Sequence, residues 1–219
     1  MSQDTAAVLL ARIAAVRVVP VVEIDSAESA APLGEALVDA GLPLIEITLR
    51  TPSAIDAIRA AAADPRLLVG AGTVVNAAQV DAAAEAGARF VVSPGISAEV
   101  VGRCRELGLL CLPGVATPTD IMAGIALGLD TLKLFPAGTI GGPAAVKALS
   151  GPFPQVRFVP TGGITAETAR SYLDLPAVLA VGGSWMVPRA ATRDGDWGTV
   201  RRLAAEAVAI GSAGSSKGA

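Results

Sequence analysis

Short apolar runs alternate with longer alanine-rich segments along the whole chain. The runs are rich in Val, Leu and Ile and are bounded by Gly and Pro. They occupy residues 16–24, 42–50, 67–74, 89–95, 109–116, 131–137, 155–163 and 177–185. Continuous apolar runs of this length predict parallel strands that are buried on both faces.

The segments between the runs carry the start and stop residues of helices. Residues 26–41 begin with Ser and end with Gly, and residues 76–87 begin with Asn and end with Gly. Ser and Asn side chains cap the first turn of a helix, and Gly is favoured just after the last turn. The pattern therefore predicts a helix in both segments, and residues 201–210 are expected to form the last helix of the chain.

Eight strand and helix units in a chain of 219 residues predict an α/β protein with a single (β/α)8 barrel, the TIM barrel. We expect the barrel domain to cover residues 1–211 and a disordered Gly/Ser-rich tail to cover residues 212–219. A doubly wound open sheet is the alternative. It is less favoured, because no G-x-G-x-x-G motif follows the first strand and because there are eight units.

The composition argues against several classes of partner. The net charge is −3 and aromatic residues make up 3% of the chain, so neither a basic patch nor a stacking platform for nucleic acid is expected. The first residues lack the basic start and long apolar core of a signal peptide, and no apolar run approaches the roughly 18 residues of a membrane span. Cys104 and Cys111 are too few, without any histidine, to suggest a disulfide framework or a zinc site. We therefore expect a cytoplasmic protein with reduced thiols.

The chain contains no histidine at all. This excludes Ser-His-Asp and Cys-His catalysis, metal sites built on histidine, and histidine as a general base. Any acid–base step must use a carboxylate, lysine, tyrosine or cysteine. In a (β/α)8 barrel such groups are expected at the C-terminal ends of the strands.

A lysine interrupts the apolar run TLKLFPA, residues 131–137. The chain has only two other lysines, Lys147 and Lys217, so Lys133 is not one member of a lysine-rich surface. Burial favours the neutral amine, which can attack a ketone carbon and form an imine. The imine then accepts electrons when the neighbouring C–C bond is made or broken. The alternative is a buried salt bridge between Lys133 and Glu46 with no catalytic role.

The run LPLIEITLR places Glu46, Thr48 and Arg50 on one face and apolar side chains on the other, because side chains alternate along a strand. If the polar face points into the barrel, a carboxylate, a hydroxyl and a guanidinium meet there. Arginine can grip a carboxylate through two hydrogen bonds, so Arg50 is a candidate ligand of an acidic substrate. The alternative is an ion pair of Glu46 and Arg50 that merely neutralises both charges.

Gly pairs end the last two predicted strands, in PTGGITAET (160–168) and VGGSW (181–185). Glycine lets backbone N–H groups approach an anion, with the N-terminus of the next helix behind them. In (β/α)8 barrels this is the usual position of a phosphate group. Tight turns that need positive φ would explain the same glycines, and the two explanations are compatible.

Several stretches, taken together, resemble the 2-keto-3-deoxy-6-phosphogluconate (KDPG) aldolases, a class I aldolase family, over nearly the whole chain. They are EITLRT (46–51), VGAGTV (69–74), SPG (93–95), PGVATPTD (113–120), LKLFPAG (132–138), GPFPQVRFVPTGGI (151–164) and GGSW (182–185). The resemblance implies a (β/α)8 barrel that forms homotrimers and needs no metal and no cofactor. It also implies a lyase that cleaves KDPG to pyruvate and glyceraldehyde 3-phosphate, as in the Entner–Doudoroff pathway.

The resemblance further implies a role for each residue at the mouth of the barrel. Lys133 is expected to form the imine, and Glu46 is expected to carry protons during imine formation, hydrolysis and C–C cleavage. The expected contacts of the pyruvate carboxylate are Arg50 and Thr73, with Pro94 and Phe135 shaping the pocket. The expected contacts of the phosphate and the far end of the substrate are Thr161, Gly162, Gly163 and Ser184.

One residue departs from the family pattern, namely Glu23 near the end of the first predicted strand, where some relatives carry arginine and others an apolar residue. A second carboxylate at the mouth does not favour an anionic substrate, so another 2-keto acid such as 4-hydroxy-2-oxoglutarate is the alternative substrate. Glu23 either points inward and disfavours the ionisation of Glu46, or turns outward to an arginine of the rim.

Two other classes of function remain open. A phosphosugar epimerase or isomerase on the same barrel needs paired acid–base groups or metal ligands, and the lack of histidine argues against its common forms. A non-catalytic trimeric barrel has no reason to carry Lys133, Glu46 and Arg50 together.

Overall fold

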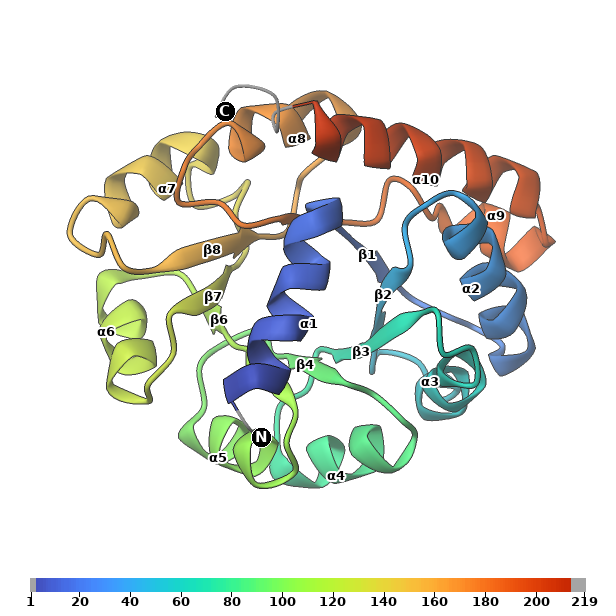
Figure 1. Ribbon diagram of the computed structural model, residues 1–219, viewed down its shortest axis with the longest axis horizontal. Coiled ribbons are helices and arrows are strands. Elements are labelled where there is room, and N and C mark those ends of the chain that lie inside the picture. Colours follow the sequence, from blue (N-terminus) through green and yellow to red (C-terminus); the bar gives the residue numbers. More distant parts are fainter. Residues whose placement is uncertain (1–2, 214–219) are drawn as a thin grey trace.

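The computed structural model describes residues 3–213, and Figure 1 shows strands at the centre with helices around them. The strands are β1 (Val18–Val22), β2 (Leu44–Thr48), β3 (Leu68–Gly72), β4 (Phe90–Val92), β5 (Leu110–Leu112), β6 (Gly114–Val115), β7 (Thr131–Leu134), β8 (Arg157–Pro160) and β9 (Val181–Gly183). The helices are α1 (Gln3–Val16), α2 (Ala30–Asp39), preceded by the 3₁₀ helix η1 (Ala27–Ser29), α3 (Ala54–Ala62), α4 (Ala77–Glu85), α5 (Ala98–Glu106), α6 (Pro118–Ala126), α7 (Gly142–Ser150), α8 (Ala166–Leu173), α9 (Arg189–Asp194) and α10 (Trp197–Ser212). Every apolar run of the sequence contains a strand, and helices follow each run, so the predicted alternation is confirmed.

Of the two predicted helix starts, the one at Asn76 is confirmed and the one at Ser26 belongs to a different helix. At α4, the Asn76 side chain accepts a hydrogen bond from the backbone N–H of Gln79 at 2.9 Å, as its position indicates. Gly87, just after α4, has φ 97°, a left-handed conformation that favours glycine. Ser26 caps the short η1 instead of α2, because its side chain accepts from the N–H of Glu28.

All strand pairs are parallel, as predicted, but their ladders divide into two sheets. Six strands follow the order β5-β4-β3-β2-β1-β9, and three follow the order β6-β7-β8. β5 and β6 belong to one predicted strand and are separated by Pro113, which has no N–H to donate. Within residues 3–213, β8 and the β9 segment are joined by isolated bridges, Phe158 with Val178 and Thr161 with Gly182. The α/β class with a curled parallel sheet is confirmed, whereas an uninterrupted eight-stranded ring stays a prediction.

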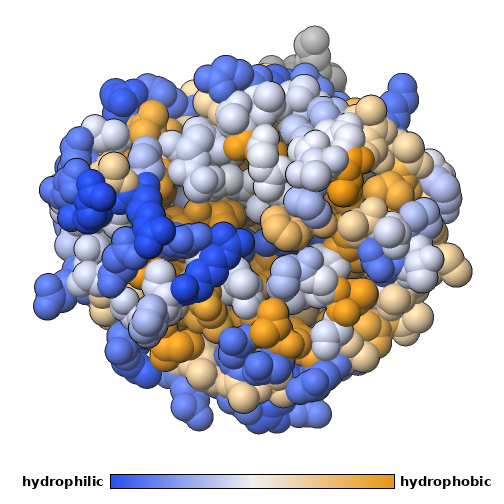
Figure 2. All heavy atoms as spheres, turned by 180° about the vertical axis from the view of Figure 1, so that it is seen from behind, coloured by the Kyte–Doolittle hydropathy of each residue, from blue (hydrophilic) through white to orange (hydrophobic). Residues whose placement is uncertain are grey.

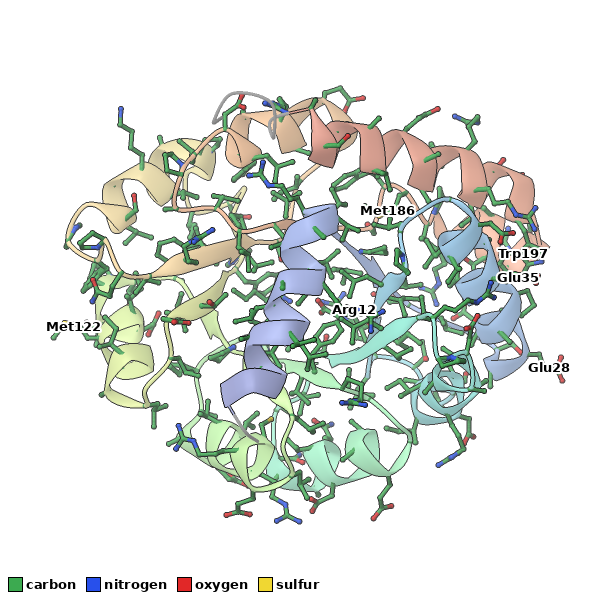
Figure 3. All side chains as sticks on the ribbon, viewed as in Figure 1. Arg12, Glu28, Glu35, Met122, Met186 and Trp197 are labelled. Carbon is green, nitrogen blue, oxygen red and sulfur yellow. The ribbon has the colours of Figure 1, made fainter. Side chains whose placement is uncertain are left out.

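The helix α1, for which the sequence pattern gave no prediction, lies across one end of the strands (Figure 1). Its side chains join a core inside the curled sheet, formed by Leu9, Ile13, Val19, Leu44, Leu68, Phe90, Val92, Leu110, Leu112, Val159, Leu179 and Ala180. Arg12, on the flank of α1, donates a hydrogen bond to the carbonyl oxygen of Arg66 at 2.9 Å, just before β3 (Figure 3). The N-terminal ends of the strands are therefore covered by an apolar helix.

A larger core fills the layer between the strands and the outer helices. Met186 is completely buried in this layer, whereas Met122 on α6 points away from it and is 61% exposed (Figure 3). Cys104 and Cys111 are buried free thiols in the same layer.

The described residues contain no helix that is both long and apolar enough to cross a membrane. The last helix, predicted over residues 201–210, extends from Trp197 to Ser212 as α10. It thus includes the first residue of the expected tail, and residues 214–219 of that tail lie outside the described residues.

Candidate active site

A cavity of about 510 Å³ opens at the C-terminal ends of β2, β7, β8 and β9. Figure 2, seen from the side opposite α1, shows a hollow near the centre of this face with strongly hydrophilic residues on one side. The predicted site residues that line the cavity are Glu46, Arg50, Lys133, Phe135, Thr161, Gly162, Gly163 and Ser184. Parallel strands end at one edge of the sheet, which is why residues so far apart in the sequence meet here.

Lys133 and Glu46 contact each other inside the cavity. Both occupy inward positions, on β7 and β2, and Nζ of Lys133 lies 3.4 Å from Oε1 of Glu46. Their side chains are only 7% and 3% exposed, so neither charge is well hydrated. Such a buried pair is weak grounds for stability, because apolar residues of similar size often stabilise as well or better. A catalytic role therefore explains this buried pair better than a contribution to stability does.

The strands beside Glu46 leave room for its carboxylate. A Cβ atom at Gly72 would overlap the Glu46 side chain, so the bare backbone of β3 forms that wall. Thr48, the next inward residue on β2, donates its hydroxyl to the carbonyl oxygen of Val22 at 3.1 Å and ties β2 to β1. The carboxylate is therefore held between two fixed strands and faces the amine of Lys133.

Phe135 separates the amine from the glycine loop after β8. The centre of its ring lies 5.1 Å from Nζ of Lys133, within the range of a cation–π contact when the amine is charged. On its other side the ring is so close to Gly162 that a Cβ atom there would lie 3.2 Å away. Phe135 therefore forms part of the pocket wall, a position that the family resemblance implied. Its ring fills the space between Lys133 and Gly162.

The tight-turn explanation for the glycine pairs applies to the loop after β8, and phosphate binding stays a prediction. Gly162 and Gly163 have φ of 95° and 73°, so the loop needs a conformation that other residues rarely adopt. Gly182 is required for close approach, since a Cβ atom there would overlap the side chain of Thr161. Thr161 is buried and Ser184 is exposed, and both face the cavity. The two loops therefore present bare backbone to one side of the cavity.

Two predicted site residues, Thr73 and Pro94, do not line the cavity. Thr73 directly follows β3 and has φ 60°, a left-handed conformation that costs a residue other than glycine about 1–3 kcal/mol. Pro94 follows β4 and is exposed. Both follow strands at the same end of the sheet as the cavity.

Glu23 lines the cavity, and its carboxylate pairs with arginines of the rim, which is the second of the two alternatives predicted for it. Oε1 of Glu23 accepts a hydrogen bond from Arg50 Nη1 at 2.9 Å, and Oε2 accepts one from Arg189 Nη1 at 3.2 Å. The predicted ion pair of Glu46 and Arg50 is replaced by these contacts: Arg50 binds Glu23, and Glu46 binds Lys133.

Arg189, which the sequence reasoning missed, also binds Asp25 through two hydrogen bonds, from Nε and Nη2. The hydrogen bonds from Arg189 hold the pKa of the Asp25 carboxyl below its ordinary value. Arg189 begins α9 directly after Pro188, and only its place after the Gly pair of β9 signals the site.

The arrangement combines a buried amine, a buried carboxylate, an exposed guanidinium and bare backbone around one cavity. It can bind an anionic ketone, form an imine at Lys133 and transfer protons through Glu46. Across residues 3–213, no three Cys, Asp or Glu side chains gather in a group suited to a metal ion.

Known proteins share this sequence and structure over most of their length. The sequence profile of the family "KDPG and KHG aldolase" matches residues 9–203. A KHG/KDPG aldolase of Escherichia coli K12 is 46% identical over 192 residues, which cover 87% of this chain and 90% of that protein. A 2-dehydro-3-deoxy-phosphogluconate aldolase of Zymomonas mobilis is 50% identical over 171 residues, which cover 78% of this chain and 82% of that protein.

Solved structures give the same result. The 2-keto-3-deoxy-6-phosphogluconate aldolase of Zymomonas mobilis ZM4, with 3-phosphoglycerate, matches with a TM-score of 0.87 and 46% identity. This match covers 91% of the present chain and 94% of that one. The KDPG aldolase of Legionella pneumophila, with pyruvate captured as a covalent carbinolamine intermediate, matches with a TM-score of 0.86 and 42% identity, over 90% and 96% of the two chains.

Proposed function

Because the chain belongs to the KDPG and KHG aldolase family, we propose that it is a class I aldolase that cleaves KDPG to pyruvate and glyceraldehyde 3-phosphate. The observation that carries the proposal is the buried contact between the amine of Lys133 and the carboxylate of Glu46 at the cavity. An amine in this position is protected from water and has a proton acceptor 3.4 Å away.

The reaction begins at Lys133. Glu46 takes a proton from the ammonium, and the neutral amine attacks the C2 ketone of the substrate to give a carbinolamine. Loss of water gives a protonated imine, which draws electrons from the C3–C4 bond when that bond breaks. The resulting enamine is protonated at C3, and hydrolysis of the imine releases pyruvate and regenerates Lys133.

Glu46 moves the protons of each step. It removes the proton from the C4 hydroxyl as the C3–C4 bond breaks, which releases glyceraldehyde 3-phosphate as an aldehyde. It then returns a proton to the enamine and assists the hydrolytic water. The other carboxylate of the cavity, Glu23, is held by two arginines, so Glu46 is the better placed acid–base group.

Three groups of residues bind the substrate in this proposal. Arg50 holds the carboxylate beside the ketone, and Phe135 bounds the pocket. The family resemblance adds Thr73 and Pro94, which follow β3 and β4 at the same end of the sheet but outside the cavity lining. The phosphate binds to the backbone of Gly162 and Gly163, with Thr161 and Ser184 beside it, near the N-terminus of α8. The anionic ligands named in the two solved relatives, 3-phosphoglycerate and pyruvate, support a site for acids of this kind.

4-Hydroxy-2-oxoglutarate remains the second candidate substrate, because the Escherichia coli relative is named for both activities. It shares the 2-keto acid that Lys133 and Arg50 recognise, but it carries a carboxylate where KDPG carries a phosphate-bearing chain. Family membership gives no support to the epimerase or to the non-catalytic barrel.

The proposal is tested by adding KDPG to the purified protein and measuring pyruvate with lactate dehydrogenase and NADH. We expect turnover that is unchanged by EDTA and absent in Lys133→Met. Lys147→Met serves as the matched control, since Lys147 is an exposed lysine on α7. No pyruvate from the wild-type protein, or full activity of Lys133→Met, would contradict the proposal.

The proposal extends to the whole molecule. The bridges between β8 and the β9 segment, and the position of β5 and β6 in one apolar run, support a closed eight-stranded ring. The family resemblance supports a homotrimer that works in the cytoplasm without a metal. Sedimentation equilibrium of the purified protein tests the trimer directly.

A further inference from the structure

Four charged side chains form a continuous chain of hydrogen bonds at the mouth of the cavity, in the order Asp25, Arg189, Glu23 and Arg50. They come from three separate places in the fold: the end of β1, the start of α9 and the end of β2. Their charges sum to zero. We call these four residues the rim chain.

The two arginines of the rim chain donate different numbers of hydrogen bonds to their partners. Arg189 donates from Nε and Nη2 to Asp25 and from Nη1 to Glu23, so all three of its nitrogens are engaged. Among the contacts of the described residues, Arg50 donates one hydrogen bond, from Nη1 to Glu23. A guanidinium has five N–H donors, so Arg50 uses one of them in the rim chain and Arg189 uses three.

We propose that Glu23 is a positioning residue that holds Arg50 over the cavity in the orientation that binds a substrate carboxylate, and that Arg189 and Asp25 fix Glu23 in turn. The inference rests on the proposed function, in which Arg50 binds the 2-keto acid. The Arg50 side chain is 48% exposed, so without a partner it is free to occupy many rotamers. One fixed hydrogen bond restricts these rotamers before the substrate arrives.

Arg189 has a second consequence for the same site. Glu23 alone would place a negative charge at the mouth and repel an anionic substrate. Arg189 balances that charge while its own three hydrogen bonds go to Asp25 and Glu23. Glu23 can therefore orient Arg50 while the mouth as a whole stays electrically neutral.

The proposal is tested through pyruvate binding instead of turnover. Borohydride traps the imine, and the pyruvate concentration that gives half the maximal trapping rate reports the affinity for the 2-keto acid. In Glu23→Leu we expect this concentration to rise about tenfold, the usual size of effect for a lost hydrogen bond to a charged group. The trapping rate at saturating pyruvate should change less than about twofold. Glu23→Gln keeps an oxygen acceptor for Arg50 and should restore part of the affinity.

A double-mutant cycle tests the role of Arg189. Arg189→Gln alone should raise the half-saturating pyruvate concentration about threefold, but it should add nothing in a protein that already carries Glu23→Leu. A full additional effect in the double variant would show that Arg189 acts independently of Glu23. Arg202→Gln is the control, because Arg202 forms a comparable exposed ion pair with Glu206 on α10.

Arg50→Met separates this inference from the proposed function. If Arg50→Met raises the half-saturating pyruvate concentration and Glu23→Leu does not, Glu23 is a rim charge and the positioning role is wrong. If Arg50→Met has no effect, the carboxylate is bound elsewhere and the proposed role of Arg50 itself is wrong. If a variant only lowers the melting temperature and the fraction of active protein, with the half-saturating concentration unchanged, the role is merely structural.

Discussion

The two ends of the curled sheet use the same strands for opposite purposes. On β2 the inward residues run from Leu44, beside α1, to Glu46 in the cavity and Thr48 above it. At the α1 end every inward position packs against apolar neighbours, and Leu9 and Ile13 complete the packing. At the other end two inward positions, those of Glu46 and Lys133, carry ionisable groups beside an open space. Two residues along β2 therefore separate Leu44, which packs in the apolar core, from Glu46, which faces the cavity.

This comparison predicts that the two ends fail differently when they are changed. A deletion near α1 removes apolar contacts and lowers the free energy of unfolding. A substitution at the cavity removes a reactive group, so activity is lost first, and stability falls only as far as a buried partner is left unpaired.

The largest effect is expected for Lys133→Met. Among the described residues it removes the only lysine that lines the cavity, and loss of a covalent nucleophile lowers kcat on the order of 10⁴-fold or more. The long apolar side chain fits the same space beside Phe135, but Glu46 loses its charged partner, so the melting temperature should fall while the protein stays folded. Activity assays and thermal unfolding of the same preparation check both points, and a variant that unfolds would contradict the separation of the two ends.

Glu46→Gln should lower kcat by about 10²–10⁴-fold, the usual contribution of a general acid–base group. The amide keeps the shape of the carboxylate but cannot carry the proton between steps. Steady-state kinetics with KDPG, together with circular dichroism, measures the effect. Near-normal turnover in the folded variant would assign the proton transfers to another group.

Phe90→Ala tests the opposite end. The ring is fully buried inside the sheet and occupies the space that a Cβ atom at Gly70 would need. Its removal should destabilise the protein by about 3–5 kcal/mol, while kcat/KM of the remaining folded protein changes little. Denaturant unfolding gives the stability, and Met122→Ala on the exposed face of α6 is the control, with an expected effect below about 0.5 kcal/mol.

Gly162→Ala should mainly affect the binding of phosphate. The added methyl lies 3.2 Å from the ring of Phe135 and the backbone has φ 95°, so the loop must shift. In the reverse reaction, the KM for glyceraldehyde 3-phosphate should rise about tenfold, and the KM for an uncharged aldehyde should rise much less. Equal changes for both aldehydes would place the phosphate elsewhere.

The smallest effect concerns pH and the rim chain. The hydrogen bonds from Arg189 lower the pKa of Asp25, so this carboxyl stabilises the fold at a pH above its unfolded pKa. The contribution is lost as the pH falls through the lower folded pKa. The wild-type protein should therefore melt slightly above Asp25→Asn at pH 7, and the difference should vanish in strong acid. A difference that grows on acidification would contradict the assignment.

The sequence predicted those features that depend on local patterns. The alternation of side chains on β2 predicted that Glu46 and Thr48 share the inward face, and the isolated lysine in an apolar run predicted Lys133 in the site. The Gly pair after β8 predicted the positive φ of that loop. These are properties of a few neighbouring residues, so the chain reveals them directly.

Features that depend on distant contacts could not be predicted in the same way. Arg189 and Glu23 are 166 residues apart, and no local pattern pairs them. The packing of α1 beneath the strands depends on tertiary contacts, as does the break between β5 and β6. Thr73 and Pro94 were placed in the site by family resemblance, and neither is among the residues that line the cavity.

The central claim is that Lys133 forms the imine, and reductive trapping tests it most directly. The protein is treated with pyruvate and borohydride, and the mass of the intact chain and of its peptides is measured. We expect one added three-carbon acid per chain, as a stable secondary amine on Lys133, and no label without pyruvate. A label on Lys147 or Lys217 instead, or no label at all, would contradict the account.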